Sequence, residues 1–229
     1  MKNLNYSIVM PIYERSEIIS RCFLSIKRQT ILPEEIIFID NNTKKKESQK
    51  LSKIIKNCFN EENFKVYLIK SEVNSSSIAR NIGAEKSKSN LIAFLDSDVV
   101  LRNDYYEILL GYFKKYPDLI AIQGIDEALV ESCKNIKNLS LPFKLLHYFE
   151  QIFETSSLLN RDKAYVSPSM AVAHPKLSSE FEIDTEWIST CAGVFKKYLF
   201  TINSFPENFV TYSNNEYIYF SYNLFKLNE

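Results

Sequence analysis

The first half of the chain alternates short apolar runs with longer segments in which apolar residues recur every three or four positions. Short apolar runs are typical of strands buried on both faces, and the periodic segments are typical of amphipathic helices. Strands are predicted at Ser7–Met10, Ile36–Ile39, Val66–Ile69, Leu91–Leu95 and Leu119–Ile122, and helices at about 17–29, 46–59 and 76–87 and from about 105. This alternation predicts an α/β fold with a mostly parallel, Rossmann-like central sheet and helices on both of its faces.

The second half, from about residue 125, is more irregular. We expect an amphipathic helix over 139–159, a mixed and turn-rich stretch over 160–186, a short strand over Thr190–Phe195 and a final helix over about 215–226. No internal repeat or low-complexity linker separates the two halves. The sequence therefore predicts a single domain over 1–229, with a regular half at 1–124 and an irregular half at 125–229.

Charge and cysteine usage narrow the class of protein. Basic and acidic side chains balance at 28 each, which argues against a general nucleic-acid binder. The four cysteines are widely separated and show no C-x-x-C spacing, so we expect a reducing cytoplasm rather than a disulfide framework or a zinc site. No apolar run approaches the ~18 residues of a membrane span, and the first strand begins too early to leave room for a signal peptide. A soluble, cytoplasmic protein is expected.

The tripeptide Asp96-Ser97-Asp98 directly follows the apolar run Leu91–Leu95. In an open α/β sheet, ligands bind at the carboxyl ends of the strands, which is where these two carboxylates are expected. Hard oxygen anions suit Mn²⁺ or Mg²⁺, and such a metal in turn suits a diphosphate. Asp and Ser are also common turn formers, so the tripeptide alone leaves an ordinary turn open.

Two other predicted strands also end in polar residues: Pro11–Arg15 follows the first strand, and Asp40 ends the second. Parallel strands bring their carboxyl ends to one edge, so Asp40 is expected to converge on a single cleft with Asp96 and Asp98. A nucleotide needs a platform for its base, acceptors for its base and ribose, and positive charge for its phosphates. Tyr13, Asp40 and a metal on Asp98 could supply these in turn.

Two of the candidates have a plain structural alternative. Tyr13 could be a packing aromatic at a strand end. Arg80, on the segment Asn74–Ala84, offers a planar cation for a phosphate or for orienting an aspartate, and it could equally be one partner of a structural salt bridge.

Four stretches of the chain resemble glycosyltransferase family 2, which has the GT-A fold. They are Ser7–Thr30 (SIVMPIYERSEIISRCFLSIKRQT), Glu35–Asn42 (EIIFIDNN), Ile78–Ala84 (IARNIGA) and Leu91–Val99 (LIAFLDSDV). Their order and spacing match the family across roughly the first 125 residues. The chain is therefore identified as similar to the nucleotide-sugar glycosyltransferases of this family.

The resemblance implies a hexosyltransferase-type enzyme that moves a sugar, with inversion, from a UDP-, GDP- or CDP-linked donor to a glycan or lipid-linked acceptor. It further implies bacterial surface glycan synthesis, with possible peripheral association at the inner face of the membrane. The residues that it assigns to the nucleotide sugar are Pro11, Tyr13, Glu14, Asp40, Arg80, Asp96, Ser97 and Asp98. Asp98 would ligate Mn²⁺ or Mg²⁺, which neutralises charge on the departing diphosphate. Residues 1–124 would bind the donor, and 125–229 the acceptor.

Two positions depart from the family's pattern. Glu14 stands where the family commonly has Asn, and the neighbouring Arg15 is expected to offset its charge. The pair Glu216-Tyr217 stands where the family has two acids, so a tyrosine takes the place of the usual catalytic base. Glu216 is our candidate for the base that an inverting transfer needs, and an acid favoured by the helix dipole is the alternative.

Four other functions are compatible with an α/β fold of this kind or with part of the motif set: a binding module, a nucleotidyltransferase, a processive synthase and a phosphoacceptor domain. The tyrosine beside Glu216 favours a catalytically weakened, nucleotide-sugar-binding module. A nucleotidyltransferase would need a glycine- and lysine-rich loop where Met10–Tyr13 stands, and a processive synthase would need membrane spans and a Q-x-x-R-W motif. A phosphoacceptor domain would need a lysine after the fifth strand, where Gln123-Gly124 stands.

Trp187 could stack on a sugar or fill the core.

Overall fold

The computed structural model describes residues 4–125, 158–161, 166, 173–175, 184–208 and 216–228. The chain divides into two compact units, 1–124 with 189–216 and 125–188 with 217–229. Most of the predicted helix over 139–159 and of the turn-rich stretch after it lies outside the described residues. The last two residues of that predicted helix, Leu158 and Leu159, instead begin strand β6. The division into a donor half and an acceptor half of one domain stays a prediction.

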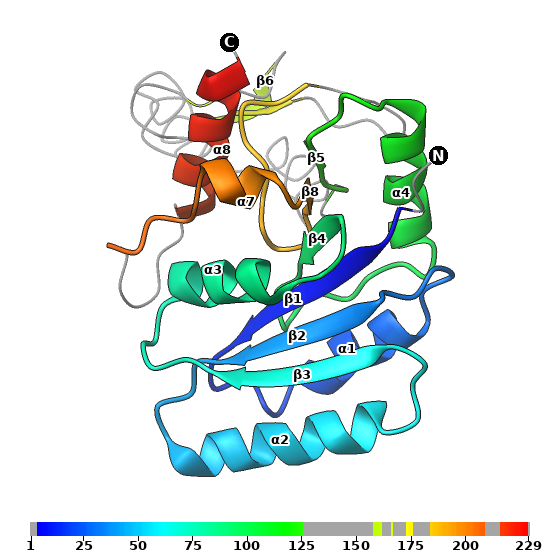
Figure 1. Ribbon diagram of the computed structural model, residues 1–229, viewed down its shortest axis with the longest axis vertical. Helices are drawn as coiled ribbons and strands as arrows, with labels where there is room; N and C mark the ends of the chain where they lie inside the picture. Colours follow the sequence, from blue (N-terminus) through cyan, green and yellow to red (C-terminus); the bar gives the residue numbers. More distant parts are fainter. Residues whose placement is uncertain are drawn as a thin grey trace, which may run out of the picture. The chain divides into compact units, whose positions relative to one another are not determined.

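A six-stranded sheet forms the centre of the first unit (Figure 1). Its strands are β1 (Tyr6–Ile12), β2 (Glu35–Asp40), β3 (Lys65–Lys70), β4 (Leu91–Phe94), β5 (Ala121–Ile122) and β8 (Val194–Lys196), in the order β3-β2-β1-β4-β8-β5. Strand β1 pairs in parallel with β2 and β4, and β2 pairs in parallel with β3. Strand β8 runs antiparallel to β4 and β5, between which it lies. The prediction of a mostly parallel sheet is confirmed.

Helices cover both faces of this sheet, as predicted. They are α1 (Ile19–Lys27), α2 (Lys45–Phe59), α3 (Ser76–Lys86), α4 (Tyr105–Lys115) and the short α7 (Leu199–Ile202). Alternate residues of β1, such as Ile8 and Met10, share a buried core with apolar residues of α1, α2 and α4. The intervening Val9 points to the other face, where α3 packs against it. The two-residue period of a strand thus fixes which helix each side chain meets.

Aromatic rings fill much of the core on both faces. Phe23 of α1 packs against Phe38 of β2 with ring centroids 5.0 Å apart, and on the other face Phe94 of β4 packs against Phe205 at 5.3 Å. Every residue of β2 and β4 is buried, which is what their unbroken apolar runs predict. Such a rigid centre holds the strand ends in fixed positions.

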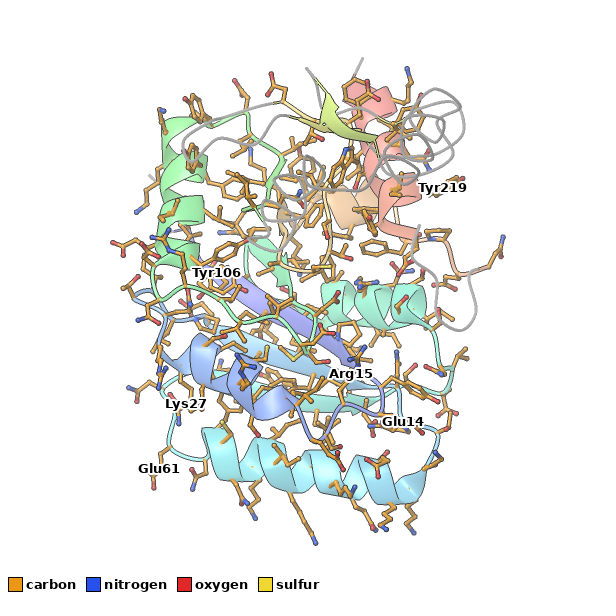
Figure 2. The ribbon with its side chains drawn as sticks, turned by 180° about the vertical axis from the view of Figure 1, so that it is seen from behind. Glu14, Arg15, Lys27, Glu61, Tyr106 and Tyr219 are labelled. Atoms are coloured by element: carbon orange, nitrogen blue, oxygen red, sulfur yellow. The ribbon has the colours of Figure 1, made fainter. Side chains whose placement is uncertain are left out.

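Register brings the carboxyl ends of β1, β2 and β4 to one edge of the sheet. Ile12 lies opposite Asp40, and Val9 lies opposite Phe94, two residues before Asp96. Figure 2 shows Glu14 and Arg15 at the end of β1, with Tyr106 toward the strand's other end, where its ring lies 4.7 Å from that of Tyr6. The expected convergence of the strand ends is therefore a feature of the fold.

The second unit contains a two-stranded parallel sheet of β6 (Leu158–Arg161) and β7 (Ala173–Pro175). It also holds α8 (Glu216–Asn228), apart from its first residue, which belongs to the first unit. Trp187 is buried against Ile218, with Val166 packed beside them, so of the two roles open to Trp187 the structure gives it core filling. In the part of the chain that the structure describes, no helix is both long enough and apolar enough to cross a membrane.

Candidate active site

The two acids of the tripeptide after β4 differ in environment. The backbone N–H of Asp96 donates to the carbonyl of Cys191 at 2.9 Å, which anchors the loop beside β8. The side chain of Asp96 is 32% exposed and that of Asp98 is 48% exposed, whereas Ser97 between them is buried. Both carboxylates can therefore meet a ligand from solvent, and Ser97 fills space beneath them.

Arg80 is buried and connects two carboxylates. Ser75 caps α3, accepting from the backbone N–H of Ile78, and this start places Arg80 in the helix's second turn. Its Nη2 lies 3.1 Å from Asp96 Oδ1, and its Nη1 lies 2.9 Å from Glu216 Oε1. With both terminal nitrogens on carboxylates, the geometry fits two of the roles that the sequence left open for Arg80: orienting an aspartate and forming a structural salt bridge.

Glu216 is only 3% exposed, and its two oxygens differ. Oε1 accepts from Arg80 and, at 2.6 Å, from the hydroxyl of Ser76 in the first turn of α3. Oε2 is also buried but has no hydrogen-bond partner among the described residues. A buried carboxylate is stable only when a positive charge and hydrogen bonds compensate it, and here one oxygen receives all of that compensation.

Asp40 is buried at the end of β2 and organises the loop that follows it. Its Oδ1 accepts from both the backbone N–H and the side-chain amide of Asn42, at 2.9 and 2.8 Å. Its Oδ2 lies 3.5 Å from Nζ of Lys70, which ends β3 in register with Asp40. Any contact between Asp40 and a bound nucleotide would therefore use Oδ2, next to a lysine that the sequence analysis did not single out.

The charged residues after β1 form ion pairs that differ from the expected one. Tyr13 is 41% exposed, as a stacking platform requires and a packing aromatic does not. Glu14 adopts a left-handed backbone with φ 48°, and its carboxylate pairs with Lys44 at 2.8 Å. Arg15 pairs instead with Asp98 Oδ2 at 3.3 Å. The expectation that Arg15 offsets Glu14 is therefore wrong.

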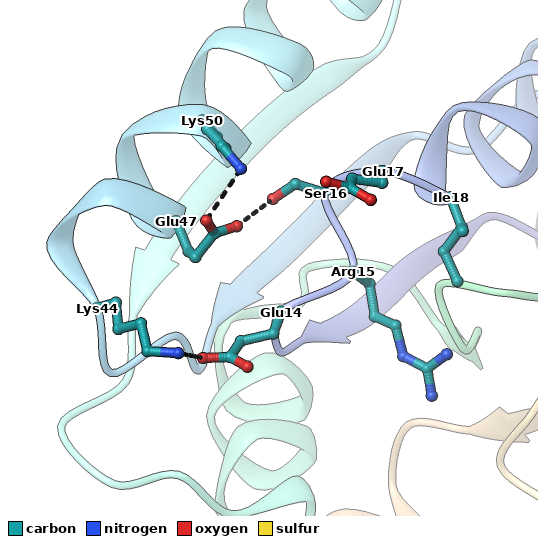
Figure 3. A pocket seen from close by; sticks show the side chains of 8 residues that line it. All are labelled: Glu14, Arg15, Ser16, Glu17, Ile18, Lys44, Glu47 and Lys50. Atoms are coloured by element: carbon teal, nitrogen blue, oxygen red, sulfur yellow. Dashed lines mark hydrogen bonds and ion pairs between the residues drawn. The ribbon is translucent and has the colours of Figure 1, made fainter.

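A hollow of about 500 Å³ lies between the loop after β1 and the start of α2 (Figure 3). Its lining residues are Glu14, Arg15, Ser16, Glu17, Ile18, Lys44, Glu47 and Lys50. Figure 3 shows most of these charges already paired, with Lys44 on Glu14 and Lys50 on Glu47. The lining carries as many acids as bases, so the hollow has no net charge to attract a ligand.

The donor set fits a divalent metal shared with a diphosphate. Among the described residues no three acids, histidines or cysteines cluster closely enough to hold a metal by themselves. Asp98 can offer its Oδ1 while Oδ2 pairs with Arg15, and Mg²⁺ is typically held by one or two carboxylates plus substrate phosphates. Burial, followed by the charges of Asp98 and Asp96, raises the pKa of the neighbouring Cys22 thiol to about 12.

Solved structures that the chain resembles are glycosyltransferases. TarS 1–349 of S. aureus in complex with UDP-GlcNAc aligns with a TM-score of 0.55 and 14% identity, over 95% of this chain and 53% of that TarS 1–349 chain. The mannosyltransferase PcManGT of Pyrobaculum calidifontis, in complex with GDP-Man and Mn²⁺, aligns with a TM-score of 0.59 and 11% identity, over 94% of this chain and 50% of that one. The fold is that of the GT-A glycosyltransferases.

Sequence comparison assigns the family. The model of glycosyl transferase family 2 matches residues 7–176, and the chain belongs to this family. An uncharacterized glycosyltransferase of Haemophilus influenzae is 33% identical over 107 residues, 46% of this chain and 41% of that protein. The glycosyltransferase AglE of Haloferax volcanii is 33% identical over 96 residues, 40% of this chain and 30% of that protein. The matched region thus covers less than half of each of these relatives.

Proposed function

We propose that the protein transfers a sugar from a nucleotide-sugar donor to an acceptor hydroxyl. The observation that carries this proposal is the convergence of strand ends in a family 2 chain: Asp40 ends β2, Asp96 and Asp98 follow β4, and both strands pair in parallel with β1 between them. The exposed ring of Tyr13 beside them supports a base-stacking role. The structural neighbours in complex with UDP-GlcNAc and with GDP-Man and Mn²⁺ support the class of donor.

Each residue of the donor side has a distinct task in this proposal. Tyr13 stacks on the base, and Asp40 accepts hydrogen bonds from the base or ribose through Oδ2. Pro11, Glu14 and Ser97 shape the wall of the site, and Arg80 holds Asp96 toward the ribose or sugar. Asp98 would hold Mn²⁺ or Mg²⁺, which when bound would neutralise the charge that builds on the leaving diphosphate.

Inversion requires a base that takes the proton from the acceptor hydroxyl. We propose Glu216 for this task, and within it Oε2, since Oε1 is engaged by Arg80 and Ser76. The finer parts of the proposal follow the family: a hexosyl group, a glycan or lipid-linked acceptor, and surface glycan synthesis on the cytoplasmic side, with peripheral membrane association. Tyr217 at the usual base position favours a second candidate, a binding module with weakened catalysis.

Calorimetry with UDP, GDP and CDP, each with and without Mn²⁺, tests the donor proposal directly on the purified chain. We expect one nucleoside diphosphate to bind, and to bind more tightly with metal. A donor-hydrolysis assay with the matching nucleotide sugars then separates an enzyme from a binding module. Failure of every nucleotide to bind would contradict the proposal, and binding without turnover of any donor would select the module.

The ion pair between Arg15 and Asp98 should compete with the metal. Arg15→Gln frees the Asp98 carboxylate, so the Mn²⁺ concentration that gives half-maximal nucleotide binding should fall by about two- to fivefold, the range expected for an exposed pair. A Mn²⁺ titration at fixed nucleotide measures this concentration. Arg28→Gln, at the exposed far end of α1, is the matched control and should leave it unchanged. A rise in the Arg15 variant would mean that Arg15 itself binds phosphate.

A further inference from the structure

Arg80 physically links the donor aspartate Asp96 to the carboxylate of Glu216. Within α3, Ser76 and Arg80 are one turn apart and share a helix face, and both donate to the same oxygen, Glu216 Oε1, at 2.6 and 2.9 Å. The other terminal nitrogen of Arg80 donates to Asp96 Oδ1 at 3.1 Å. Two carboxylates 120 residues apart in sequence are therefore held by one planar cation.

We propose that Glu216 is a positioning residue for donor binding, acting on Asp96 through Arg80. This role rests on the proposed function and is separate from the proposed base, because it uses Oε1 rather than Oε2. The guanidinium group is rigid and planar, so fixing one of its nitrogens fixes the direction of the other. Glu216 and Ser76 thereby determine where Arg80 meets Asp96.

The surroundings of Arg80 leave its guanidinium few other positions. The group is buried and lies 5.8 Å from the centre of the Phe205 ring. Its Nε has no partner among the described residues, so the two carboxylates supply its counter-charge. Charge-assisted hydrogen bonds of this kind are short and directional.

The contact with Arg80 restricts the position of the Asp96 side chain. The Asp96 side chain is one-third exposed and also has a hydrogen bond with the thiol of Cys191, so Arg80 adds a second, charged restraint on its position. Held at Oδ1, Asp96 presents Oδ2 in one direction before the donor arrives. Pre-ordering one side chain in this way should strengthen nucleotide binding by about three- to tenfold.

Nucleotide affinity distinguishes positioning from base catalysis. Glu216→Gln keeps the shape of the side chain but removes its charge. In the presence of Mn²⁺, it should lower the affinity for the nucleoside diphosphate that wild type binds by about three- to tenfold. Glu207→Gln is the matched control, because Glu207 contacts α3 through Asn81 at 3.1 Å. Wild-type affinity in Glu216→Gln would overturn the positioning role and leave the base role intact. Ser76→Ala, which removes one donor to Oε1, should shift affinity in the same direction by a smaller factor.

Double variants test whether the effect passes through Asp96. In an Asp96→Asn background, Glu216→Gln should cause no further loss of nucleotide affinity; an undiminished loss there would overturn the proposed route. Urea unfolding of wild type, the two single variants and the double variant tests the same link without a ligand. The double variant should lose more stability than the sum of the single variants, because it leaves Arg80 buried without a counter-charge, and additivity would contradict the link. Absence of nucleotide binding by wild type would contradict the proposed function, while the unfolding cycle would still decide the link.

Discussion

Asp98→Asn should abolish the stimulation of nucleotide binding by Mn²⁺ while leaving the fold intact. Loss of the carboxylate removes the exposed, anionic oxygen ligand that the donor set offers, and an amide is a much poorer ligand for a hard cation. Replacing residues that only support a metal ligand costs about 10- to 100-fold in metal affinity, so replacing the ligand itself should cost at least that. The fold should persist, because Asp98 is half exposed and its ion pair is with Arg15, which is also exposed.

Calorimetric titration of the nucleoside diphosphate at several Mn²⁺ concentrations measures this effect. Asp118→Asn provides a matched control, since Asp118 is an exposed acid in the turn before β5. The control should keep full Mn²⁺ dependence, and both variants should unfold within about 0.5 kcal/mol of wild type. Asp98 would be excluded as a metal ligand by an Asp98→Asn protein that responds to Mn²⁺ as wild type does.

The order of strands and helices in the first unit could be predicted because each element carries its own local signal. Unbroken apolar runs marked β1, β2 and β4, and their burial follows from that composition. The place of β8 had no such signal. This strand lies between β4 and β5, and its antiparallel pairing depends on residues about a hundred positions away. A short segment does not encode a partner so distant in the sequence.

In the candidate site, too, some features could be predicted from the sequence and others could not. Parallel strands bring their carboxyl ends to one edge, so the common edge at which β1, β2 and β4 end could be expected from strand order alone. The partners of individual side chains could not be predicted from the sequence. Glu14 pairs with Lys44 and has a left-handed backbone, a conformation that the sequence does not reveal for a glutamate. Lys70 was missed, although its register position opposite Asp40 follows from the predicted pairing of β2 with β3.

Gly83→Ala should cause a large loss of stability. Gly83 lies where α3 crosses β1, and a Cβ there would overlap Cγ1 of Val9 and lie 3.0 Å from its Cγ2 and 3.2 Å from its Cβ. Rotating Val9 cannot relieve the overlap fully, since its Cβ is fixed to the central strand. Overpacking of this kind should lower the free energy of unfolding by about 1–3 kcal/mol. A shift of α3 would also move Arg80, so nucleotide affinity should fall with stability.

Gly111→Ala makes the same chemical change in the interior of a helix, but without a neighbour. A Cβ at Gly111 of α4 meets nothing within 4 Å, so alanine should raise the free energy of unfolding by about 1 kcal/mol through its better helix propensity. Urea unfolding of the two variants should therefore shift in opposite directions. Adding Val9→Ala to Gly83→Ala removes the overlapping methyl groups, and the pair should cost less than the sum of its parts. A Gly83→Ala protein as stable as wild type would show that α3 can move off β1 at no cost.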